Sequence, residues 1–84
     1  MLMLYTDGCS KGNPGLGDGG GVLCDSSGSP LFAFSIFLEE TSSLRAETLA
    51  LLIGLRECAQ RGFGNVWVQL DSLVLVGILQ KQSQ

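Results

Sequence analysis

The sequence contains no histidine, and this absence excludes several kinds of catalytic site. A Ser-His-Asp triad needs histidine as its general base, and most catalytic zinc sites use histidine ligands. The three cysteines, Cys9, Cys24 and Cys58, show no Cys-x-x-Cys spacing, so they form neither a zinc pattern nor a paired disulfide framework. We expect reduced thiols and an intracellular, reducing compartment, without distinguishing nucleus from cytoplasm.

Long apolar runs and basic charge are also scarce. The longest apolar stretches, residues 49–55 and 73–79, hold seven residues each, whereas a membrane-spanning helix needs about 20. We therefore expect no membrane association. Five Lys and Arg residues against eight Asp and Glu give a net charge of −3, which is not typical of a domain that binds nucleic acid through its own charge.

The chain has 84 residues, of which 45% are hydrophobic. This is enough for one domain with a small core. We expect a single, partial domain over residues 1–84, and make no prediction of its oligomeric state.

The first half of the sequence predicts a three-stranded antiparallel meander. Residues 1–6 are typical of a buried strand. Residues 8–21 contain seven glycines, which predicts a loop that leads into a second strand near residue 22. The turn-forming residues 25–29 and the apolar, aromatic residues 30–38 then indicate an antiparallel hairpin.

The second half predicts helices around a fourth strand. Residues 41–43 offer helix N-caps, residues 44–61 predict a helix, and Gly62 is a plausible stop. Residues 65–70 indicate a strand parallel to the first, because a helical crossover connects them. Asp71 and the following serine are then expected to cap a second helix over residues 73–80.

Three carboxylates stand at informative places in this arrangement. Asp7 and Asp71 each follow a strand, and parallel strands bring their carboxyl ends to one edge of the sheet. Glu47 falls on the small, apolar stripe of the helix that includes Ala50 and Gly54. A carboxylate buried there requires a cation or a hydrogen-bond partner. The structural alternatives are a turn residue for Asp7, a helix cap for Asp71 and a dipole-stabilised first-turn residue for Glu47.

Together these three carboxylates would form an oxygen-only site suited to Mg²⁺ or Mn²⁺. Two such ions about 4 Å apart can activate a water and stabilise the leaving oxygen of a phosphodiester, without a protein nucleophile. The lack of histidine is compatible with this chemistry.

Four segments in the same order resemble ribonuclease H domains. They are residues 5–15 (YTDGCSKGNPG), 19–23 (GGGVL), 41–47 (TSSLRAE) and 68–72 (VQLDS). The resemblance covers essentially the whole chain and is greatest to plant ribonuclease H-like domains related to retrotransposons. It implies an α/β fold of the ribonuclease H-like class, in which a mixed sheet of a three-stranded meander and a parallel fourth strand is combined with helices.

The resemblance also implies a set of functional residues. Asp7, Glu47 and Asp71 would be catalytic carboxylates that, with Gly8, form the metal site for two Mg²⁺ or Mn²⁺ ions. An RNA-DNA hybrid would be the substrate. The turn that follows the first strand and the start of the helix would face the backbone of the hybrid. The residues in these two segments are Cys9, Lys11, Gly12, Asn13, Ser42 and Ser43.

The sequence departs from the family in three respects, of which the mildest is Cys9 at a position usually held by a small residue. Family members usually continue to a fourth catalytic aspartate, often with a nearby histidine, and this chain ends before that region. Ser42 and Ser43 replace an asparagine pair found in many members. The leading hypothesis is a metal-dependent endonuclease that cuts the RNA strand of RNA-DNA hybrids. The alternative is a truncated, weakly active or inactive remnant that at most binds nucleic acid or a partner. A third hypothesis is nucleotide hydrolysis by an actin-like fold.

Overall fold

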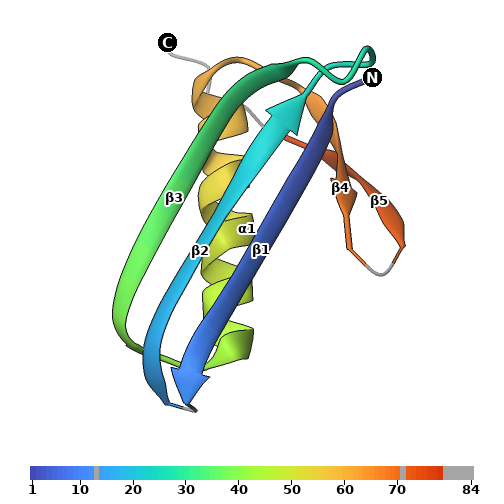
Figure 1. Ribbon diagram of the computed structural model, residues 1–84. Coiled ribbons are helices and arrows are strands. Elements are labelled where there is room, and N and C mark those ends of the chain that lie inside the picture. Colours follow the sequence, from blue (N-terminus) through green and yellow to red (C-terminus); the bar gives the residue numbers. More distant parts are fainter. Residues whose placement is uncertain (13, 71, 79–84) are drawn as a thin grey trace, which may run out of the picture.

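The computed structural model describes residues 1–12, 14–70 and 72–78. These residues form a five-stranded mixed sheet in the order β3-β2-β1-β4-β5, with one helix packed against one face (Figure 1). The elements in chain order are β1 (Met3–Gly12), β2 (Gly15–Cys24), β3 (Pro30–Thr41), α1 (Ser43–Gln60), β4 (Asn65–Gln69) and β5 (Leu73–Gly77). Among the described residues, no helix combines the length and the apolarity needed to span a membrane.

In the glycine-rich stretch, residues 8–12 and 15–21 belong to the paired strands β1 and β2, so the loop predicted there is wrong. β1 and β2 pair antiparallel along their whole length, from Met3 opposite Cys24 to Gly12 opposite Gly15. β2 also pairs with β3, so ladder hydrogen bonds on both sides hold it despite its glycines. At Gly20 a Cβ atom would lie 2.6 Å from the carbonyl oxygen of Phe34. A glycine here accommodates a close neighbouring backbone and does not mark a break.

The hairpin between β2 and β3 is confirmed, and Asp25 organises its turn. The Asp25 Oδ1 accepts hydrogen bonds from the Ser27 hydroxyl at 2.6 Å, the Ser27 N–H at 2.9 Å and the Ser29 N–H at 3.0 Å. The Ser27 hydroxyl, followed by the Ser29 N–H, holds the pKa of Asp25 below its ordinary value, because these donors favour the ionised form.

The predicted helix is confirmed within a residue at each end. The Ser42 side chain is the N-cap and accepts a hydrogen bond from the Arg45 N–H at 3.1 Å. The helix ends at Gln60, and Gly62 follows with a φ of 86°. Glycine adopts this left-handed conformation without steric cost, so it stops the helix as expected.

The fourth strand is parallel to the first, as predicted, with Met3 opposite Trp67 and Tyr5 opposite Gln69. The second helix predicted over residues 73–80 is wrong where the structure describes it, because Leu73–Gly77 form β5, antiparallel to β4. Four of these five residues alternate leucine and valine, and the β-branched valines favour a strand. An isolated helix of this length is marginal. Residues 79–84 lie outside the described residues.

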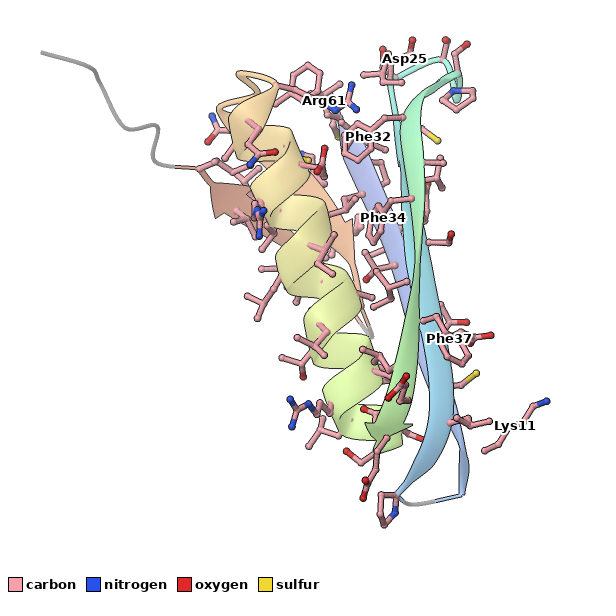
Figure 2. All side chains as sticks on the ribbon, turned by 90° about the vertical axis from the view of Figure 1, so that its left-hand side faces the viewer. Lys11, Asp25, Phe32, Phe34, Phe37 and Arg61 are labelled. Carbon is pink, nitrogen blue, oxygen red and sulfur yellow. The ribbon has the colours of Figure 1, made fainter. Side chains whose placement is uncertain are left out.

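The hydrophobic core lies at the end of the sheet where α1 finishes. Its largest fully buried side chains come from the sheet strands and from the carboxyl-terminal half of α1: Leu4, Leu23, Val66, Val68 and Cys58. Figure 2 shows Phe32 and Phe34 of β3 pointing from the sheet toward α1, whereas Lys11 projects away from the helix. The Arg61 guanidinium lies 4.5 Å from the Phe32 ring centroid and covers this end of the core.

Candidate metal-binding cleft

A cleft of about 480 Å³ lies where β1, the first half of α1 and the end of β4 meet. Among the described residues, β4 pairs with β1 only as far as Tyr5, so this edge of β1 has no partner strand there from Thr6 onward. The lining residues come from all three segments: Thr6, Asp7, Leu44, Glu47, Thr48, Leu51, Gln69 and Leu70. Two of the three carboxylates singled out in the sequence, Asp7 and Glu47, therefore share one cleft.

Direct backbone contact between β1 and α1 brings these two carboxylates together. Gly8 is buried against the first turns of the helix. A Cβ atom at Gly8 would lie 2.5 Å from the carbonyl carbon of Ala46 and 2.7 Å from the backbone nitrogen of Glu47. Real Cβ atoms do not approach other atoms this closely, so only glycine fits. Asp7 and Glu47 are thus the immediate neighbours of the point where strand and helix touch.

Asp7 is exposed, and its carboxylate is oriented by the chain that follows it. The Gly8 N–H donates a hydrogen bond to Oδ1 of Asp7 at 2.9 Å. In the part of the chain that the structure describes, no Lys or Arg forms an ion pair with Asp7 or Glu47. Two carboxylates that line one cleft without a cationic partner make a favourable environment for a metal cation.

Glu47 is exposed in the structure, so the burial expected for it is wrong. The buried row of α1 consists of Ala46, Ala50, Gly54 and Cys58. Glu47 belongs to the neighbouring row with Leu51 and Leu55, which are partly buried against the core. β4 ends at Gln69, and Glu47 lines the cleft together with Gln69 and Leu70. No burial penalty therefore needs to be offset.

Asp71 lies outside the described residues, and its predicted place in the site stays a prediction. The parallel register ends with Tyr5 opposite Gln69. Asp7 follows Tyr5 by two residues in the sequence, and Asp71 follows Gln69 by two residues. Within residues 1–12, 14–70 and 72–78, no cluster of three metal-ligating side chains occurs. The described part of the cleft supplies two carboxylates.

The residues predicted to face nucleic acid are divided between two places. Lys11 and Gly12 end β1, and a 3.1 Å hydrogen bond between the hydroxyls of Ser10 and Ser43 joins this end to the start of α1. Ser42 is engaged in capping the helix. Asn13 lies outside the described residues.

Cys9 is directed elsewhere. Its thiol donates a hydrogen bond to Oδ1 of Asp18 at 3.1 Å, and the two residues share a small hollow with the Lys11 side chain and the exposed Phe37 ring. The hydrogen bond to Asp18, followed by the negative charge of that carboxylate, raises the pKa of the Cys9 thiol. Cys9 does not line the carboxylate cleft.

The sequence reasoning missed the uncharged lining of the cleft. Thr6, Thr48 and Gln69 add hydroxyl and amide groups next to the carboxylates. The two threonines could have been found from their positions in the sequence, because Thr6 directly precedes Asp7 and Thr48 directly follows Glu47. The Thr48 hydroxyl also donates a hydrogen bond to the carbonyl oxygen of Leu44 at 2.8 Å.

Comparison with known proteins agrees with this architecture. Residues 5–84 match the family model described as Reverse transcriptase-like. A protein of Arabidopsis thaliana named as a candidate ribonuclease H is 39% identical over 79 residues, which is 94% of this chain. The crystal structure of the ribonuclease H1 called LC11, in complex with an RNA/DNA hybrid, superposes with a TM-score of 0.77 and 33% identity over 86% of this chain. The chain is a ribonuclease H-like domain of this family.

A second solved relative extends the comparison. Ribonuclease H1 from the halophilic archaeon Halobacterium salinarum superposes with a TM-score of 0.75 and 30% identity over 80% of this chain. The ribonuclease H-like mixed sheet predicted from the sequence is thereby confirmed. The chain spans 55% and 51% of these two solved proteins and 13% of the Arabidopsis protein.

Proposed function

We propose that this ribonuclease H-like domain binds Mg²⁺ or Mn²⁺ through Asp7, Glu47 and Asp71 and hydrolyses the RNA strand of RNA-DNA hybrids. The observation that carries the proposal is the cleft that both Asp7 and Glu47 line. Among the described residues neither carboxylate has a cationic partner. Asp71 is assigned from its sequence position alone.

The chemistry of the cleft fits a hard divalent cation. The polar groups that line it are carboxylates, threonine hydroxyls and a glutamine amide, with neither cysteine nor histidine among them. Oxygen donors of this kind are the ligands that Mg²⁺ and Mn²⁺ prefer, whereas zinc sites favour nitrogen and sulfur. Both carboxylates are exposed, so water can complete the coordination of an ion.

The protein's contribution to the reaction follows from the positions of its side chains. Asp7 and Glu47 would hold the metal, and the Gly8 N–H fixes the orientation of Asp7 through its hydrogen bond to Oδ1. Without a cation, the two negative charges would repel a phosphodiester. Bound divalent ions supply charge neutralisation and activation of a water molecule, so the chain needs no nucleophile of its own.

Substrate recognition would use the end of the molecule that carries Lys11 and Ser43. The Ser10 to Ser43 hydrogen bond holds this strand end beside the helix start, where hydroxyls are available to phosphates and 2′-hydroxyls. The Lys11 ammonium projects from the opposite face of the sheet at the same end (Figure 2), where it is available to a phosphate. A hybrid as substrate is supported by the LC11 relative, which was solved with an RNA/DNA hybrid.

The direct test is cleavage of a hybrid labelled on its RNA strand, with Mg²⁺ and with a chelator. The 84-residue chain and the same chain extended at its carboxyl end are compared, each as the parent and as Asp7→Asn. Asp25→Asn is the matched control, since it makes the same chemical change in a turn remote from the cleft. We expect metal-dependent cleavage that Asp7→Asn abolishes and Asp25→Asn retains.

Two outcomes would change this conclusion. Equal cleavage by the parent and Asp7→Asn would overturn the metal-binding role of Asp7. Retention of the hybrid without cleavage, by both the short and the extended chain, would identify the domain as a binding module.

A further inference from the structure

The sheet and α1 are not evenly separated along their interface. Toward the end of α1, buried side chains such as Leu4 and Cys58 lie between the two layers. Toward its start, Gly8 and the backbone of Ala46 meet directly. The interface is a wedge whose thin edge coincides with the candidate metal-binding cleft.

The contact at the thin edge is between backbones. The atoms that a Cβ at Gly8 would meet are the carbonyl carbon and oxygen of Ala46, at 2.5 and 2.6 Å, and the nitrogen of Glu47, at 2.7 Å. Backbone atoms inside a helix cannot rotate away as a side chain can. Any side chain at position 8 must therefore push strand and helix apart.

The Gly54 contact at the thick part of the wedge is different. A Cβ there would meet the Leu4 methyl groups at 3.0 and 3.2 Å and the edge of the Phe34 ring at 3.3 Å. These neighbours are the ends of side chains, which would have to shift by only a few tenths of an ångström. The same added methyl group thus has a rigid neighbour at Gly8 and a yielding one at Gly54.

We infer that Gly8 is a positioning residue that sets the separation of Asp7 and Glu47, so that both can hold one divalent cation. The inference rests on the proposed function. Gly8 acts in two ways: its missing side chain lets β1 touch α1 between the two carboxylates, and its N–H orients Oδ1 of Asp7. Metal sites depend strongly on such supporting groups, whose loss typically weakens affinity about 10-fold to 100-fold.

The test compares Gly8→Ala with Gly54→Ala by titrating Mn²⁺ into the 84-residue chain and measuring free Mn²⁺ by electron paramagnetic resonance. Each variant adds one methyl group to the same interface. We expect Gly8→Ala to weaken Mn²⁺ binding by about 10-fold or more. Gly54→Ala should remain within about twofold of the parent, because sites that share no partners behave independently.

The outcomes separate the positioning role from the proposed function. Unchanged Mn²⁺ affinity in Gly8→Ala, with binding lost in Asp7→Asn, overturns the positioning role and leaves the metal site standing. Equal weakening in both glycine variants also overturns it, since general loosening of the interface would then be the cause. If the parent binds no Mn²⁺, the proposed function fails and the positioning role fails with it.

A second measurement covers the case in which Gly8→Ala does not fold. Mn²⁺ broadens the nuclear magnetic resonance signals of nearby amides, so the unaltered chain reports where the ion sits. We expect the amides of Gly8 in β1 and Glu47 in α1 to broaden together at low Mn²⁺ occupancy. Broadening centred on another part of the chain would overturn the inference.

Discussion

The two ends of the interface between the sheet and α1 are built from opposite kinds of residue. At the core end, Leu4, Leu23 and Val66 are fully buried and separate the layers. At the cleft end, Gly8 and Ala46 let the layers touch, and the neighbouring carboxylates are exposed. One end therefore supplies burial of apolar surface, and the other supplies a fixed spacing between charged groups.

This difference shows how a small domain can hold an acidic site without burying it. An unpaired carboxylate in the core would lower the stability of the fold by roughly several kcal/mol, because it would lose its hydration. Here the carboxylates lie at the edge of the interface, and the rigid contact beneath them defines their positions. Changes at the core end should reduce stability, whereas changes at the cleft end should mainly reduce metal binding.

The largest expected effect is at the core end. Leu4 is fully buried, and Leu4→Ala should lower the free energy of unfolding by about 2–5 kcal/mol, as for other buried leucines. Leu44→Ala is the matched control, because Leu44 lines the cleft and is 74% exposed. It should change stability by no more than about 0.5 kcal/mol. Urea denaturation measures both, and similar losses in the two variants would contradict the contrast between the ends.

An intermediate effect is expected at the start of α1. Ser42→Ala removes the side chain that accepts the Arg45 N–H, and loss of such a cap typically costs about 0.5–2 kcal/mol. Ser43→Ala removes only the exposed hydroxyl contact to Ser10 and should cost less. Helical circular dichroism during thermal unfolding compares them. A larger loss in Ser43→Ala would show that the contact to β1, and not the cap, secures this end of the helix.

The smallest effect is expected at the turn beyond the core end. Because the folded-state pKa of Asp25 is lowered, its contribution to stability is present above its ordinary value of 3.8 and is lost as the pH falls through the folded-state pKa. Ser27→Ala removes the first cause of this shift and should raise the pKa of Asp25. Ser26→Ala, in the same turn, should leave it unchanged. A nuclear magnetic resonance titration of the Asp25 carboxyl decides, and equal pKa values in parent and Ser27→Ala would refute the assignment.

The sequence correctly predicted the features that depend on helix capping, on helix termination and on the connection of two strands through a helix. Ser42 as the cap, Gly62 as the stop and the parallel pairing of β4 with β1 are confirmed. Residues 8–21 were misjudged because glycine disfavours a strand only where no neighbouring strand supplies hydrogen bonds, and β2 has neighbours on both sides. Residues 73–77 are apolar enough for helix or strand, and pairing with β4 decided between them.

The sequence predicted carboxylates that line the site, but not how exposed they are. The motifs pointed to Asp7 and Glu47, which the structure places in one cleft. The helical periodicity gave the face of Glu47, but it could not show that this face borders an open cleft. The backbone contact at Gly8 forms only when the strand and the helix pack together, so no local sequence pattern predicts it. The ligand roles of these carboxylates and of Asp71 remain predictions.

The most direct test of the central claim is calorimetric titration of Mn²⁺ into the 84-residue parent chain, Asp7→Asn and Glu47→Gln. If the two carboxylates hold one ion, the parent binds Mn²⁺ and each substitution alone removes most of that affinity. Binding that survives one of the two substitutions unchanged would contradict the account.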